Sequence, residues 1–191
     1  MKFFIITKRH IMLCIALVSV LTVAVIGSAV TFAQGERKLP IYCVQTEKKQ
    51  IAISFDAAWG NDDTEQLISI LKEYEVPATF FVVGSWVDKY PESVKQLSDA
   101  GHQVQNHSNT HPYMTQLSTE QMKNELESCN QKIEAITGAC PTLFRPPYGD
   151  YDNAVIDAVA DMKMYTIQWD VDTIDIKVMT NAYHCAIMSI V

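Results

Sequence analysis

Apolar runs of strand length alternate with amphipathic helical stretches between residues 51 and 168, and this alternation limits the possible folds more than any other feature. Five runs read as strands: 51–55, 78–83, 103–106, 142–144 and 164–168. Helical signals separate them, namely an apolar period behind Asp62, Asp63 and Thr64, a stretch from Pro91 to Gly101, the capping box that starts at Ser118 and stops at Gly138, and a stretch from Asp152 to Asp161. The pattern predicts an α/β fold with a parallel sheet.

Polar side chains directly follow these predicted strands. They are Asp56 after the first, His107 and His111 after the third, Arg145 after the fourth, and Asp170, Asp172 and Asp175 after the fifth. In parallel α/β folds the chemistry gathers at the carboxyl ends of the strands. We therefore expect these residues to lie close together at the carboxyl-terminal edge of the sheet.

Two histidines and one aspartate stand out among these residues. His107 and His111 are four positions apart, a spacing that predicts one face of a helical turn and the reach of one metal ion. Surface or capping histidines are the alternative. A carboxylate that follows a buried strand, such as Asp56, is energetically costly unless it is paired, bound to a ligand or solvated in a cleft. Such a position suits a general base. An aspartate in a turn or at a helix cap is the alternative.

The segment Arg145-Pro146-Pro147-Tyr148-Gly149 combines a guanidinium with two rigid prolines and a permissive glycine. It predicts a stiff loop that presents Arg145. Three tryptophans could stack on sugar rings or belong to the core: Trp59, Trp86 and Trp169.

Residues 11–33 carry no charge and directly follow the basic cluster Lys8-Arg9-His10. As a helix they would reach roughly 34 Å at about 1.5 Å per residue, enough to cross a bilayer. Two interpretations stay open: a signal peptide cleaved after Ala33, or an uncleaved signal anchor that makes the membrane a partner. Either places the residues after Gln34 outside the cytoplasm by the positive-inside rule.

The charge and the cysteines exclude other classes of function. A net charge of −7 argues against electrostatic binding to the phosphate groups of nucleic acids, so no nucleic-acid partner is expected. The cysteines after the leader show no Cys-x-x-Cys spacing, and we expect free thiols: Cys43, Cys129, Cys140 and Cys185. Two disulfides among these four are the alternative.

From about Ile51 to Asp175 the chain resembles the polysaccharide deacetylases of the NodB-homology type, also known as carbohydrate esterase family 4. Four segments carry the resemblance: Ser54-Phe55-Asp56, the stretch from His107 to Pro112, the stretch from Arg145 to Gly149, and a weaker one from Trp169 to Asp175. The resemblance implies a distorted, incomplete (β/α) barrel, preceded here by the hydrophobic helix. It also implies metal-dependent removal of N-acetyl groups from chitin-like or peptidoglycan glycan.

The resemblance implies roles for individual residues as well. His107 and His111 would bind a divalent metal, commonly zinc, and Asp56 would act as general base. The backbone N–H of Tyr148 would help to hold the oxyanion. Arg145 would orient Asp56 while pairing with Asp175.

Three departures separate this chain from the family pattern. Most members have a second aspartate after the base as third metal ligand, whereas Ala57 follows Asp56 here; Asp62 or Asp63 could supply that ligand, and this first motif is similar to that of sporulation-associated members. Ile176 follows Asp175 where tryptophan is usual. The Leu-x-His segment of the general acid is missing, and His184 lacks its context.

The resulting organisation has four parts: a leader at 1–33, a linker at 34–50, an incomplete deacetylase domain at 51–175, and a divergent tail at 176–191. We expect a C-terminally truncated barrel with exposed strand edges. The expected function is N-deacetylation of cell-wall glycan. A catalytically silent glycan-binding relative, with Trp59, Trp86 and Tyr148 on the sugar, is the alternative, followed by an amidase acting on a small cyclic amide.

Overall fold

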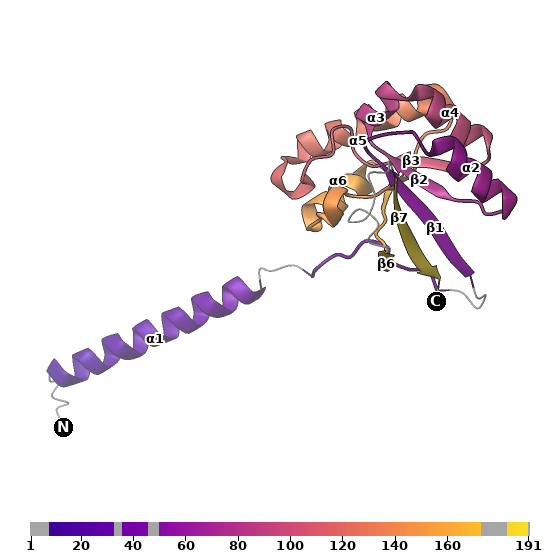
Figure 1. Cartoon of the computed structure of the whole chain (residues 1–191). Helices are drawn as coiled ribbons and strands as arrows, with labels where there is room; N and C mark the ends of the chain where they lie inside the picture. The colour runs from indigo at the N-terminus through magenta and orange to yellow at the C-terminus, as the bar shows by residue number, and fades with distance from the viewer. Residues whose placement is uncertain (1–7, 33–35, 46–49, 173–182, 191) are drawn as a thin grey trace, which may run out of the picture. The chain divides into compact units, whose positions relative to one another are not determined.

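The computed structural model describes residues 8–32, 36–45, 50–172 and 183–190 (Figure 1). The chain divides into two compact units, Met1–Arg37 and Lys38–Val191. The first unit contains helix α1 (Lys8–Phe32), which covers most of the predicted leader. Within the described residues, no helix meets the length and apolarity that a membrane span requires. The assignment of residues 1–33 as signal peptide or anchor stays a prediction.

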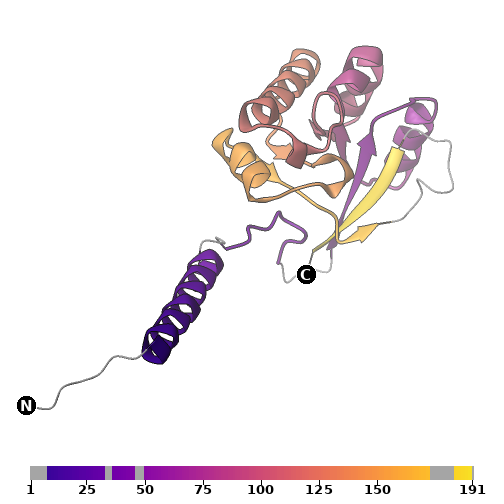
Figure 2. The ribbon, with the colours of Figure 1, turned by 90° about the vertical axis from the view of Figure 1, so that its left-hand side faces the viewer.

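The second unit is built on a seven-stranded sheet of order β5-β4-β3-β2-β1-β7-β6. Its first five strands are parallel neighbours: β1 (Gln50–Ala57), β2 (Thr79–Val82), β3 (Gln103–Asn106), β4 (Leu143–Phe144) and β5 (Tyr165–Thr166). They curl into an open half-barrel with the helices outside (Figures 1 and 2). The predicted parallel α/β architecture and incomplete barrel are confirmed.

Helices follow the strands as the sequence pattern predicts. Their bounds are α2 (Thr64–Glu73), α3 (Gly84–Lys89), α4 (Pro91–Asp99), α5 (Thr119–Thr137) and α6 (Asn153–Asp161), with 3₁₀ turns η1 (Met114–Gln116) and η2 (Pro147–Gly149). Both arms of the predicted capping box form at the start of α5, between Ser118 and Gln121. Gly138 ends the helix at φ 73°, a left-handed conformation that glycine adopts without strain. Helix α3 has no counterpart among the predicted elements.

The period of two along each strand divides its side chains between the two faces of the sheet. Phe55, Phe80 and Val82 pack toward the helices and join Trp86, Leu97 and other buried residues in the main core. The intervening residues of β1 and β2 point to the opposite, concave face. That face receives Asp56 and Phe81, which are register partners.

Three segments outside the predicted strands also pair with the sheet. Ile41, in the predicted linker, forms a parallel bridge with Ile167. In the predicted divergent tail, β7 (Tyr183–Ile190) runs antiparallel to β1 along all eight residues of that strand. The short strand β6 (Val171–Asp172), which precedes the tail, pairs with β7. The edge of β1 is therefore covered, unlike the exposed edges that a truncated barrel predicts.

The described cysteines Cys43, Cys129 and Cys140 are free thiols, as predicted, and the side chain of Cys185 lies outside the described residues. Cys129 is fully buried under β2, and burial raises the pKa of its thiol to about 12. It is consequently a core residue with little nucleophilic character.

Candidate active site

A buried ion pair occupies the concave face at the carboxyl ends of the strands. An Nη of Arg145 donates to Asp56 Oδ1 at 2.6 Å, and the other Nη donates to Ser54 Oγ at 2.7 Å. Arg145 is 0% exposed and Asp56 9%. The guanidinium carbon also lies 4.1 Å from the ring centroid of Phe81. The aspartate predicted to end the first strand is therefore held by a guanidinium from the loop after β4.

The local sequence explains why these groups meet. Ser54 and Asp56 are two positions apart on β1, so both side chains project from the same face. The N–H of Arg145 bonds to the carbonyl oxygen of Asn106 at 3.0 Å, which extends the β3–β4 pairing by one residue. Removing either partner would leave a buried charge uncompensated, a loss that typically costs about 3–5 kcal/mol.

His107 lies beside this pair with a defined tautomer. Its Nδ1 is 2.7 Å from the carbonyl oxygen of Arg145, and because a carbonyl only accepts, Nδ1 carries the proton. In the neutral ring this leaves the lone pair on Nε2, which lies 3.9 Å from Asp56 Oδ2. The backbone of the arginine loop thus orients the imidazole that the sequence predicts as a metal ligand.

His111 reaches the same place through a loop and not through a helical turn. The two imidazole centroids are 5.0 Å apart, but Ser108 and His111 adopt φ of 67° and 61°. Non-glycine residues pay roughly 1–2 kcal/mol for this left-handed conformation, so the surroundings must hold it. The predicted proximity of the two histidines is confirmed, and the predicted helical turn is wrong.

The environment keeps His111 neutral. Burial, and then the neighbouring His107, lower its pKa to about 4, against a smaller opposing effect of Asp56. A neutral imidazole is the form that binds a metal.

Exposed aromatic rings surround His111 at the mouth of the site. The ring centroid of Tyr148 lies 4.6 Å from that of His111, and the Tyr148 ring stacks on Tyr113 with a centroid distance of 4.3 Å. On His111 the ring of Trp59 also packs, with a centroid distance of 5.7 Å. Trp59, Tyr148 and Tyr113 are 60%, 57% and 49% exposed. Trp86, by contrast, is 1% exposed and its indole N–H donates to the carbonyl of Gly60. Of the two interpretations of Trp86, the core residue is confirmed and the contact with sugar is excluded by its burial.

The side chains here that could hold a metal ion are the two imidazoles of His107 and His111. Among the described residues, no group of three His, Cys, Asp or Glu side chains is arranged to hold a metal. Asp62 and Asp63 consequently do not complete a three-residue set with the histidines, and Ala57, where most of the family has aspartate, carries no ligand atom. Asp175, the predicted partner of Arg145, lies outside the described residues.

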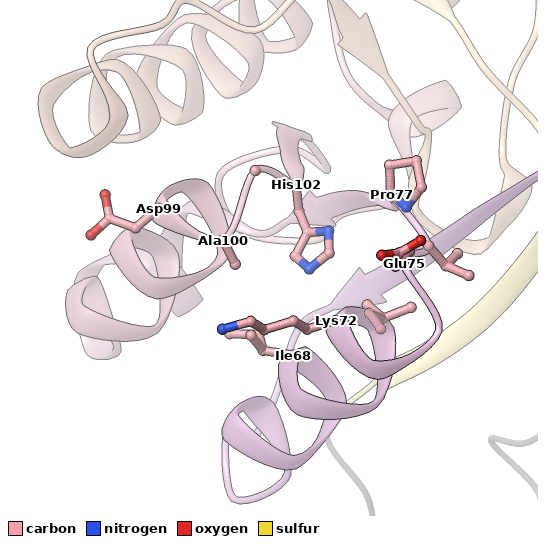
Figure 3. A pocket seen from close by; sticks show the side chains of 10 residues that line it. Ile68, Lys72, Glu75, Pro77, Asp99, Ala100 and His102 are labelled. Atoms are coloured by element: carbon pink, nitrogen blue, oxygen red, sulfur yellow. The ribbon is translucent and has the colours of Figure 1, made fainter.

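A separate cavity of about 640 Å³ lies at the opposite, amino-terminal end of β2 and β3 (Figure 3). Apolar side chains from α2 and the following turn line it together with Lys72, Glu75, Asp99 and His102. Figure 3 shows the His102 ring at its centre, between Lys72 and Pro77. None of the predicted site residues lines this cavity.

Three contributors to the site were not assigned a role from the sequence: Ser54, Phe81 and Tyr113. The period of two along the first strand could have identified Ser54 as a neighbour of Asp56 on one face. Phe81 would have required the register between β1 and β2. Tyr113 reaches Tyr148 across 35 positions of sequence, and no local pattern predicts that stack.

Comparisons with known proteins agree with this fold. Residues 44–167 match the polysaccharide deacetylase family. An uncharacterized Bacillus subtilis protein, YlxY, is 40% identical over 136 residues, which are 71% of this chain and 43% of that protein. The peptidoglycan-N-acetylmuramic acid deacetylase PdaA of Bacillus subtilis is 35% identical over 138 residues, 72% of this chain and 52% of the relative.

A solved structure is also similar. The wild-type BA3943 protein of Bacillus anthracis, described as a pseudoenzyme of family CE4, superposes with a TM-score of 0.71 at 39% identity. The superposition covers 74% of this chain and 50% of that one. This chain thus spans about half the length of the relatives it matches.

Proposed function

Because the chain belongs to the polysaccharide deacetylase family, we propose that it removes N-acetyl groups from cell-wall glycan of the peptidoglycan type. The observation that carries this proposal is the buried Asp56–Arg145 pair with His107 beside it, at the carboxyl ends of the parallel strands. Relatives named for deacetylation of peptidoglycan support the substrate class.

In this proposal Asp56 is the general base. Arg145 occupies Oδ1, so Oδ2, which faces His107, is the oxygen that accepts the proton of the attacking water. Arg145 and Ser54 fix the carboxylate in this orientation, which limits the reorganisation needed during the reaction. The backbone N–H of Tyr148 is the proposed donor to the oxyanion.

A divalent ion, zinc being our proposal, would be held by His107 and His111. The defined tautomer of His107 and the neutral ring of His111 suit such an ion. When bound, it would supply a Lewis acid that lowers the pKa of water and polarises the acetamide carbonyl.

The aromatic rings at the mouth support a glycan substrate. Trp59 and the stacked pair of Tyr113 and Tyr148 present exposed ring surface beside His111. Sugar rings carry apolar C–H faces that pack on such surfaces, and few polar groups then suffice to orient them.

We also propose that the domain works outside the cytoplasm, where cell-wall glycan is found. The uncharged stretch behind Lys8-Arg9-His10 would export it, with cleavage after Ala33 or retention as a membrane anchor. Fractionation followed by N-terminal sequencing distinguishes the two fates, and a cytoplasmic product with an intact leader would contradict both.

The test is release of acetate from N-acetylglucosamine oligomers by the full chain in the presence of Zn²⁺. We expect acetate from the wild type and its loss in His107→Ala. Equal release by both proteins would contradict the role of the histidines.

A second candidate function is binding of glycan without hydrolysis. Two observations favour it: Ala57 at the position of the usual third ligand, and the likeness to a structure described as a pseudoenzyme. It predicts that oligomers bind, that Trp59→Ala weakens binding, and that no acetate appears at any Zn²⁺ concentration.

A further inference from the structure

One side chain outside the site gathers three hydrogen bonds from the histidine loop, which we define as residues 107–111. Glu125, in the second turn of α5, accepts from the backbone N–H of Asn109 at 2.9 Å and from that of Thr110 at 2.7 Å. The hydroxyl of Thr110 donates to its other carboxylate oxygen at 2.8 Å. Two adjacent amides and a hydroxyl thus end on one carboxylate.

The other side of the histidine loop is fixed by the start of α3 and by a side chain of α5. The N–H groups of Gly84 and Ser85 donate to the carbonyl oxygens of Ser108 and Asn109, both at 2.9 Å. The ammonium of Lys132, one of the α5 residues, donates to Asn109 Oδ1 at 2.7 Å. These contacts hold the outer turn of the loop, but only Glu125 bonds to the two N–H groups at its centre among the described residues.

The backbone of the histidine loop needs such support. Ser108 and His111 flank the two amides and adopt positive φ, a conformation that a non-glycine residue keeps only when its surroundings impose it. An acceptor of full negative charge makes stronger bonds to backbone N–H groups than a neutral one does. The carboxylate therefore acts on the segment between the two imidazoles.

We propose that Glu125 is a positioning residue, which sets the place of the His111 ring relative to His107 by fixing the Asn109–Thr110 amides. Its consequence for metal binding rests on the proposed function, whereas its effect on the loop does not. Supporting groups of metal ligands typically change metal affinity by about 10- to 100-fold when removed.

The helix offers a matched control. Glu127 is also a glutamate of α5, but it is exposed and its recorded partner is Gln131 on the same helix. Alanine favours helix, so Glu125→Ala and Glu127→Ala keep α5 equally well. Two further variants separate the contributions. Glu125→Gln keeps one acceptor oxygen but removes the charge, and Thr110→Val removes only the hydrogen bond from the Thr110 hydroxyl to Glu125.

The experiment measures two quantities on the full chain and its variants: amide hydrogen exchange in the histidine loop, and affinity for Zn²⁺ by calorimetry. In Glu125→Ala we expect the Asn109 and Thr110 amides to exchange at least about tenfold faster and Zn²⁺ affinity to fall about 10- to 100-fold, with smaller changes in Glu125→Gln. Glu127→Ala is expected to match the wild type in both.

Each outcome decides a separate point. Unchanged exchange in Glu125→Ala would overturn the proposal, as would faster loop exchange with unchanged Zn²⁺ affinity. If wild-type chain binds no Zn²⁺, the metal part of the proposed function fails, and the exchange measurement still tests the role of Glu125. If Glu125→Ala does not fold, Thr110→Val decides: we expect faster exchange at the backbone amide of residue 110 than in the wild type, and exchange at the wild-type rate would overturn the proposal.

Discussion

The two ends of the parallel sheet hold buried polar side chains differently. At the carboxyl end, Asp56, Arg145 and His107 are linked to one another: the two Nη atoms of Arg145 bond to Asp56 and Ser54, and His107 bonds to the carbonyl oxygen of Arg145, although the buried Nε of Arg145 has no hydrogen-bond partner in the described structure. At the amino end, His102 accepts a hydrogen bond from the Ala78 N–H through Nδ1, but its buried Nε2 has no partner in the described structure.

This difference separates a site from a packing position. A network of paired charges is rigid, and any single deletion leaves a buried charge behind, so the geometry is strongly specified. A buried ring nitrogen without a partner, such as His102 Nε2, loses the hydrogen bond that water would have given it. Burial alone therefore does not mark function, whereas mutual pairing of buried polar groups at the strand ends does.

The largest effect is expected from breaking the carboxyl-end network. Arg145→Met leaves Asp56 buried without a counter-charge, and we expect the free energy of unfolding to fall by about 3–5 kcal/mol in urea denaturation. The double variant Asp56→Leu/Arg145→Met leaves no unpaired charge and should regain most of that loss. A loss below about 1 kcal/mol in the single variant would contradict the tightly paired site.

A smaller effect is expected from crowding the histidine loop. A Cβ at Gly84 would lie 2.4 Å from Asn109 Oδ1 and 3.1 Å from its Cα, so Gly84→Ala must displace the loop and should cost about 1–3 kcal/mol. Gly101→Ala, at the amino end, meets nothing within 4 Å and pays only for its φ of +85°. Chemical shifts of the His111 ring should move in the first variant only. Equal shifts in both would show that the loop is not packed against Gly84.

At the amino end we expect a dependence on pH. Burial lowers the pKa of His102 from its ordinary value of 6.5. As pH falls below 6.5, His102 is therefore protonated in the unfolded chain before it is protonated in the folded chain, which favours unfolding. Stability is then full above pH 6.5 and declines below it. His102→Gln should remove part of this slope in urea titrations at several pH values. The pH dependence of stability that His111 contributes has the same sign and should remain in this variant. Identical slopes in the two proteins would contradict the desolvated environment of His102.

The smallest effect is expected at the rim of the cavity. Lys95 donates to both carboxylate oxygens of Asp99 at 2.8 Å, one helical turn apart, but both side chains are exposed. Such pairs contribute about 0.3–0.5 kcal/mol. Lys95→Ala should therefore change the urea midpoint only marginally, and a loss above about 1 kcal/mol would show that the amino end is more tightly coupled than its exposure indicates.

The strands and the buried half of the site could be predicted because local rules determine them. The period of the apolar residues places the strands, and parallel pairing brings Asp56, His107 and Arg145 to one edge whatever the loops do. The capping box before α5 and the glycine after it depend only on neighbouring residues, and both were predicted correctly.

The histidine loop and the outer strands could not be predicted because distant contacts decide them. Ser108 and His111 adopt positive φ in a loop that hydrogen-bonds to Glu125 and Gly84, and no local pattern connects those two residues to the loop. Similarly, Ile41 joins the sheet through Thr166 and Gln168, and β7 pairs with β1 from the other end of the domain. Tertiary pairing overrides local propensity in these segments.

The most direct test of the account is acetate release from N-acetylated peptidoglycan fragments by the full chain with Zn²⁺, measured beside its isosteric variant Asp56→Asn. The account predicts release by the wild type and a fall of at least about a hundredfold in the variant, the contribution typical of a general base. Wild-type chain that is folded, binds the glycan and yet releases no acetate would contradict the proposed hydrolysis and leave the non-catalytic glycan-binding function.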